Sequence, residues 1–78
     1  MIGKVLKYMR KQKNLKQGDL IKILNIGQST LSDYENEKIS IDFNMIEKLA
    51  SICDYEIIFR NRITKEEFKA KDLERKDV

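Results

Sequence analysis

Two short amphipathic segments separated by only three residues constrain the fold of this chain more than any other feature. They span residues 17–24 and 28–36. Their apolar positions recur at helical spacing: Leu20, Ile21 and Leu24 in the first, Leu31 and Tyr34 in the second. Between them, Asn25 tolerates a left-handed backbone, Ile26 is expected to point inward, and Gly27 can cap the second helix. The sequence therefore predicts two helices joined by a tight turn.

A helix is predicted on each side of this pair. Residues 2–13 form an amphipathic segment that ends at Asn14, which suits a left-handed turn. Residues 43–53 follow Asp42, a good N-cap. The apolar faces of these helices are Ile2, Val5, Leu6 and Met9, then Phe43, Ile46, Leu49, Ala50 and Cys53. The chain is therefore expected to be mainly α-helical, a compact bundle of four to five helices.

The segment 55–61 differs from the rest, because it is rich in β-branched and aromatic residues that alternate with polar ones. That pattern favours a short strand, although Tyr55, Ile58 and Phe59 also fit a helical stripe. A strand needs a partner, and no other segment indicates one. The simplest partner is therefore the same segment of a second subunit.

After this segment, a last helix is expected from about residue 65. Thr64 and Glu67 match a capping box, and Ile63 and Phe68 stand where a hydrophobic staple needs them. Almost no apolar face follows Leu73. The expected organisation is thus one domain over residues 1–62, followed by a partly frayed helix or tail over 63–78.

Composition excludes several function classes. The chain has 78 residues, one cysteine and no histidine, so no disulfide can form within the chain and the Cys53 thiol has no histidine base. No metal-ligand cluster, phosphate-binding glycine loop or nucleophile–base pair is present, so neither an enzyme nor a cofactor is expected. Charged residues interrupt the N-terminus, and no apolar run could span a membrane, so the cytoplasm is the expected location.

The positive charge is concentrated at one end. The formal net charge is +3, but residues 1–16 hold six basic residues and no acidic one. Such an end suggests a polyanionic partner. The alternative is a solvated helix face.

The stretch LKQGDLIKILNIGQSTLSDYENEK, with the residues around it, resembles the lambda-repressor-like, Cro-type helix-turn-helix proteins of the XRE family. The similarity covers residues 2–56, with the motif at 17–36. The matching positions are Arg10, Leu15, Gln17, Leu20, Leu24, Ile26, Leu31, Tyr34 and Glu35. The departures are Asn14, Asn25 and Glu37 in place of Gly, Ile21 in place of a small residue, Ile41 in place of Pro, and Lys16 in place of a capping Ser or Thr.

The resemblance implies a double-stranded DNA-binding regulator that reads the major groove with helix 28–36. The residues expected to contact bases are Gln28, Ser29, Thr30, Ser32 and Asp33. Those expected to contact phosphates are Lys13, Asn14, Lys16, Gln17, Asn36 and Lys38. Arg10 and Glu35 are expected to form a structural ion pair. One such helix covers few base pairs, so a homodimer on a palindromic operator is expected.

The subtype stays open between a phage repressor, a restriction–modification controller and an antitoxin that represses its own operon. Segment 55–61 resembles the strand that pairs subunits in HipB-type antitoxins, which makes a toxin a candidate partner. The expected dimer interface is Tyr55, Ile57, Ile58 and Phe59. The alternative function is a protein-interaction module, such as an antitoxin binding its toxin, that has weak or lost DNA binding.

Overall fold

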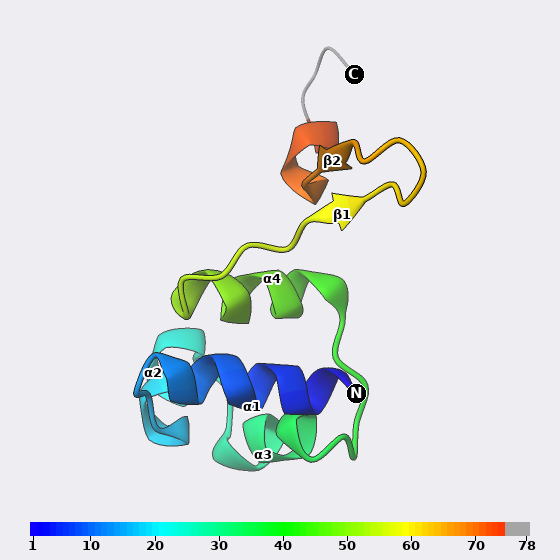
Figure 1. Ribbon diagram of the computed structural model, residues 1–78. Coiled ribbons are helices and arrows are strands. Elements are labelled where there is room, and N and C mark those ends of the chain that lie inside the picture. The colour runs from blue at the N-terminus through cyan, green and yellow to red at the C-terminus, as the bar shows by residue number, and fades with distance from the viewer. Residues whose placement is uncertain (75–78) are drawn as a thin grey trace.

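The computed structural model describes residues 1–74 and contains four α-helices followed by a small β-hairpin and a 3-10 helix (Figure 1). The elements are α1 (Ile2–Gln12), α2 (Gln17–Leu24), α3 (Gln28–Glu35), α4 (Phe43–Ile52), β1 (Phe59–Arg60), β2 (Glu67–Phe68) and the 3-10 helix η1 (Ala70–Glu74). The four helices confirm the predicted ones to within one residue at each end. No helix of the described part is long and apolar enough to cross a bilayer.

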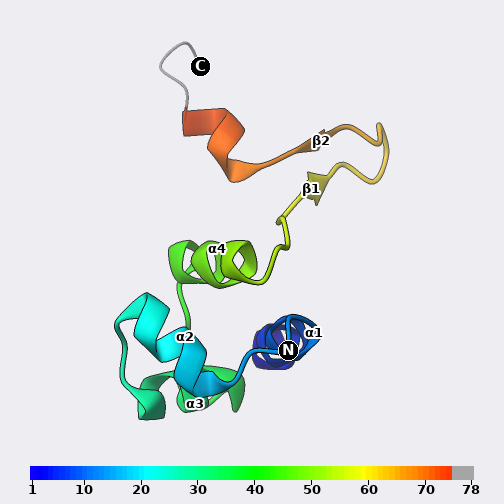
Figure 2. The ribbon, with the colours of Figure 1, turned by 90° about the vertical axis from the view of Figure 1, so that its left-hand side faces the viewer.

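The helices enclose one small core. Its buried residues are Leu6, Met9, Leu20, Leu31, Leu49, Ala50 and Cys53. Leu20 and Leu31 are the most deeply buried, with 1% and 0% exposure, so the pair α2 and α3 is fixed to α1 and α4 through them. The hairpin and η1 lie beyond α4, at the opposite end of the molecule from α3 (Figures 1 and 2).

Three non-glycine residues in the helix connections adopt a left-handed backbone. Asn14 and Asn25 have φ of 59° and 56°, which confirms the prediction for both turns. Glu37, where the family has Gly, has φ of 61°. The turn after α3 therefore keeps a left-handed conformation without a glycine, although a left-handed backbone costs an ordinary residue about 1–2 kcal/mol.

The strand expected over 55–61 is shorter, and its partner is not the expected one. β1 contains only Phe59 and Arg60, and it pairs antiparallel with β2 of the same chain, Phe59 opposite Phe68 and Arg60 opposite Glu67. The aromatic rings explain this pairing. Phe59 stacks on Phe68 at 5.3 Å between ring centroids and lies 5.8 Å from Phe43 of α4. The prediction that no second strand exists was wrong.

The helix expected from residue 65 is also absent. The Asn61 carboxamide accepts hydrogen bonds from the backbone N–H groups of Ile63 and Thr64, and Lys65 turns left-handed at φ 68°. These contacts close a hairpin loop and leave Ile63 88% exposed, so the expected staple to Phe68 does not form. Helical structure begins only at Ala70. Residues 75–78, at the end of the tail expected to fray, lie outside the described part.

The N-terminus of α1 packs closely against the end of α3, and Gly3 allows it. A Cβ atom on Gly3 would lie 2.5 Å from the Glu35 carbonyl oxygen and 2.7 Å from that of Tyr34. These are backbone atoms that cannot rotate away. Gly3 therefore sets the distance between α1 and α3.

We expect Gly3→Ala to lower the free energy of unfolding by about 1–3 kcal/mol, the usual effect of overpacking. The matched control is Gly18→Ala, because a Cβ there meets nothing within 4 Å. Gly18 lies inside α2, so that change should stabilise the protein by up to about 1 kcal/mol. Urea unfolding of the two variants measures both effects, and equal stabilities would contradict the close packing at Gly3.

Candidate nucleic-acid interface

Helix α3 turns one side to the core and the other to solvent. Leu31 and Glu35 are buried, and Tyr34 is half-buried. The residues expected to contact bases lie away from this side: Gln28 and Ser29 are exposed, and Thr30, Ser32 and Asp33 are half-buried. The open side of α3 thus carries a mixed set of hydrogen-bond donors and acceptors.

The end of α3 is ordered by contacts within the motif. The Asn36 carboxamide donates to the Ser32 hydroxyl at 3.2 Å, and the backbone N–H of Lys38 donates to the Asp33 carbonyl at 2.9 Å. The hydroxyl proton of Ser32 remains available to another acceptor. Asn36 and Lys38 are both exposed just past the helix.

Arg10 and Glu35 form a bidentate ion pair between α1 and the last turn of α3. Arg10 Nε donates to Glu35 Oε2 at 2.7 Å, and Nη2 donates to Oε1 at 3.0 Å. Arg10 Nη1 also donates to the Leu15 carbonyl at 2.9 Å. The two side chains are only 9% and 2% exposed, so the pair is shielded from water and orients α3 against α1.

Gln17 joins this pair instead of standing free at the start of α2. Its Nε2 donates to Glu35 Oε1 at 3.0 Å. Burial alone would raise the pKa of the Glu35 carboxyl group. Hydrogen bonds from Arg10 and Gln17, with the charges of Arg10 and Lys7, outweigh burial and hold this pKa below its usual value. Glu35, at the end of α3, is therefore charged and is bound by Arg10 of α1 and Gln17 of α2.

Four of the residues expected to contact phosphates lie at the start of α2 or in the turn before it: Lys13, Asn14, Lys16 and Gln17. Lys16 is exposed, and its backbone N–H donates to the Asp19 carboxylate at 2.8 Å, which forms half of a capping box. The N–H groups of Gln17 and Gly18 are in the first turn, where no intrahelical acceptor exists. They can therefore donate to an anion at this helix terminus.

Lys13 is already paired in the free protein. Its ammonium contacts the carboxylate of Asp54, just after α4, and this hydrogen bond and charge raise the Lys13 pKa. A phosphate would have to compete with Asp54 for Lys13. No local pattern in the sequence indicates this contact, because the two residues are 41 positions apart.

Glu37 was likewise missed as a contact residue. Its carboxylate accepts a hydrogen bond from the Gly3 backbone N–H at 2.9 Å and pairs with the N-terminal ammonium. These hydrogen bonds lower the Glu37 pKa. The only signal in the sequence was an unusual residue at a position where the family has Gly.

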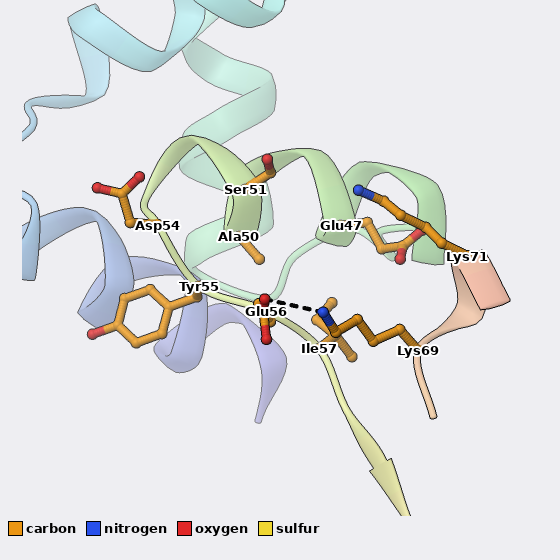
Figure 3. Close-up of a pocket in the computed structure, with 9 residues that line it drawn as sticks. All are labelled: Glu47, Ala50, Ser51, Asp54, Tyr55, Glu56, Ile57, Lys69 and Lys71. Atoms are coloured by element: carbon orange, nitrogen blue, oxygen red, sulfur yellow. Dashed lines mark hydrogen bonds and ion pairs between the residues drawn. The ribbon is translucent and has the colours of Figure 1, made fainter. Parts of the chain in front are cut away.

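A cavity of about 380 Å³ lies between α4, the segment after it and the chain around η1 (Figure 3). Glu56 and Lys69 form an ion pair across it at 3.1 Å, with Tyr55 on one wall. It is formed by elements on the far side of α4 from α3, so it is separate from the open side of the motif. No group of side chains in residues 1–74 has the composition of a metal site.

The comparison with known families agrees with this geometry. A family model described as helix-turn-helix matches residues 6–59 of the 78-residue chain. The chain therefore belongs to the helix-turn-helix family of lambda-repressor and Cro type, which confirms the resemblance seen in the sequence. Searches of curated proteins and of solved structures gave no significant match. Membership of this family makes the chain a DNA-binding transcriptional regulator in general.

We expect Glu35→Gln to destabilise the protein by about 3–5 kcal/mol, because it leaves Arg10 charged and buried without a counter-ion. The double variant Arg10→Met/Glu35→Leu should recover most of this loss. The coupling energy from the double-mutant cycle of Arg10→Met, Glu35→Leu and the double variant should exceed about 0.5 kcal/mol. Glu67→Gln is the control, since its partner Arg60 has a side chain 65% exposed and the pair contributes at most about 1 kcal/mol.

The lowered Glu35 pKa also predicts how the stability of the protein changes with pH. Its stabilising contribution is complete above the unfolded value of about 4.3 and is lost as the pH falls through the lower folded value. Urea unfolding below pH 4 should therefore show a loss of stability that is smaller in Arg10→Met/Glu35→Leu. The same acid profile in both proteins would contradict this role of the pair.

Proposed function

We propose that this protein is a sequence-specific repressor that binds a palindromic operator as a homodimer and reads the major groove with α3. The observation that carries the proposal is the orientation of α3. The Arg10–Glu35–Gln17 network fixes its buried side, and Gln28 and Ser29 are exposed at its N-terminal end. This is the end that helix-turn-helix proteins present to base edges.

Each polar residue of α3 has a chemical role in this proposal. Gln28 can bond adenine N6 and N7 together, and Ser29 and Thr30 can bond bases or phosphates. Asp33 can accept a hydrogen bond from a cytosine amino group, and its negative charge can reject other bases by repulsion. Ser32 is held by Asn36 and contacts the same groove.

Phosphate contacts supply affinity without reading sequence. They come from Lys13, Asn14, Lys16 and Gln17 on one flank, and from Asn36 and Lys38 after α3. Gln17 can link a bound phosphate to α3. Its amide already donates one proton to Glu35 and has a second for a phosphate.

The homodimer is proposed to form along the open edge of β1. Asn61 N–H donates to the Glu66 carbonyl at 2.8 Å, so the backbone groups of Asn61 and Phe59 face β2. The backbone groups of Ile58 and Arg60 therefore point outward, and an isolated two-stranded hairpin is marginally stable. The same edge of a second copy would extend the sheet to four strands.

Three of the four residues expected at the dimer interface are accessible for this. Tyr55, Ile58 and Phe59 are 40%, 46% and 42% exposed. Ile57 instead packs against the core of its own chain.

The subtype that we favour is an autoregulatory antitoxin or phage repressor, with a toxin as a further partner of the antitoxin form.

Selection of bound duplexes from random DNA gives the operator, and Gln28→Ala then tests the reading of bases. We expect affinity for the operator to fall by about 1–3 kcal/mol, with one base position relaxed. Asn44→Ala, an exposed amide on α4, is the control and should bind as wild type. If Gln28→Ala weakens operator and random DNA equally, Gln28 does not read a base. Absence of any duplex binding would favour the protein-interaction module.

For the dimer, we expect wild-type protein to sediment as a dimer at micromolar concentration and Ile58→Asp as a monomer. A carboxylate beside the β1 edge would have to be desolvated in the extended sheet. Ile63→Asp is the control, because Ile63 lies in the hairpin loop and is 88% exposed. A wild-type monomer, or equal effects of the two substitutions, would rule out the β1 edge.

A further inference from the structure

Three lysines on α1 form one basic row, which we call the α1 stripe: Lys4, Lys7 and Lys11. Their spacing of three and four places them on the same side of the helix, and all three are exposed. Helix α1 contains no acidic residue. Within residues 1–74, none of the three lies within ion-pair distance of a carboxylate.

The α1 stripe borders α3. Gly3 and Arg10 lie one turn before and one turn after Lys7, and both contact the end of α3, through the Glu35 carbonyl and the Glu35 carboxylate. Lys7 is therefore on the edge of α1 nearest to α3. The hydrogen bonds from Arg10 and Gln17 do most to lower the pKa of Glu35 against the effect of burial, and the charge of Lys7 adds to them. The hydrogen bonds from the N-terminus and Gly3 do most to lower the pKa of Glu37, and the charge of Lys4 adds to them. Both views show α1 beside α3 (Figures 1 and 2).

Some other cations of residues 1–74 have a carboxylate partner: Arg10, Lys13, Arg60 and Lys69. Others in the same range, such as Lys48, Lys65 and Lys71, have none, but they lie apart, on α4, in the hairpin loop and on η1. The α1 stripe places like charges at neighbouring positions of a helix, where they repel one another in the free protein. A bound polyanion would remove this repulsion and gain attraction to all three charges together.

We propose that the α1 stripe binds the phosphates of the DNA strand that passes beside α3, as a contact surface additional to the start of α2. This inference rests on the proposed function. The major groove is about 12 Å wide and a helix with its side chains is about 10–12 Å across, so phosphates flank the inserted helix on both sides. Helices α1 and α2 border α3 from different sides (Figure 2). The surface recognises charge and spacing and reads no base.

The test is the salt dependence of binding to a fluorescently labelled random-sequence duplex, titrated at several NaCl concentrations. We expect K4Q/K7Q/K11Q to reduce the slope of log K against log [salt] by about 2–3 units, at about 0.9 per phosphate contact. The control K48Q/K65Q/K71Q removes the same charge from α4, the hairpin loop and η1. It should change the slope by less than about one unit. Circular dichroism checks that both variants fold.

K16Q separates failure of this inference from failure of the proposed function, because Lys16 contacts phosphate in that proposal. If wild type binds duplex and K16Q reduces the slope by about one unit, the proposed function stands. The α1 stripe is then excluded if its triple variant matches the control triple, or if it weakens binding without changing the slope. If wild type shows no salt-dependent binding, the proposed function itself fails.

Discussion

The bidentate pair between Arg10 and Glu35 is the interaction on which the arrangement of the motif depends. It joins α1 to the end of α3 and, through Gln17, includes the start of α2. Removing two charges from water is expensive, so such a pair adds little stability compared with apolar residues of the same size. What it adds is orientation. With α3 in this placement, the three guanidinium nitrogens of Arg10 and the Gln17 amide all donate to acceptors at once.

The close approach of α1 and α3 is a second constraint on the same contact. Gly3 allows the helices to meet without a Cβ, and the Glu37 carboxylate then accepts the free N–H of Gly3. This hydrogen bond helps to offset the left-handed backbone of Glu37, which costs about 1–2 kcal/mol for an ordinary residue. Glu37, which stands where the family has Gly, therefore helps to hold the N-terminus of α1.

Charge is distributed so that the two ends of the molecule differ. Residues 55–74, which contain the hairpin and η1, hold five basic and five acidic side chains, so their charges balance. Residues 1–16, which contain α1, hold six basic side chains and no acidic one. A duplex approaching from the side of α3 would meet the end of the molecule with uncompensated positive charge.

The sequence by itself determined the four helices and their connections, because their signals are local. Apolar spacing, the Asp42 cap and the two asparagines that turn left-handed act within a few residues of one another. The resemblance to a known family also indicated the pairing of Arg10 with Glu35 and the side of α3 that is open.

Only the tertiary structure decided the C-terminal part and the partners of several site residues. Thr64 and Glu67 matched a helix start, but the Asn61 carboxamide accepts from the backbone N–H of Thr64, which Glu67 would bind in a capping box. The choice between the two depends on Phe43, which supports the stacked Phe59 and Phe68 from a distant helix. Contacts such as Lys13 with Asp54 have the same origin. They join residues far apart in the chain, so no local pattern could determine them.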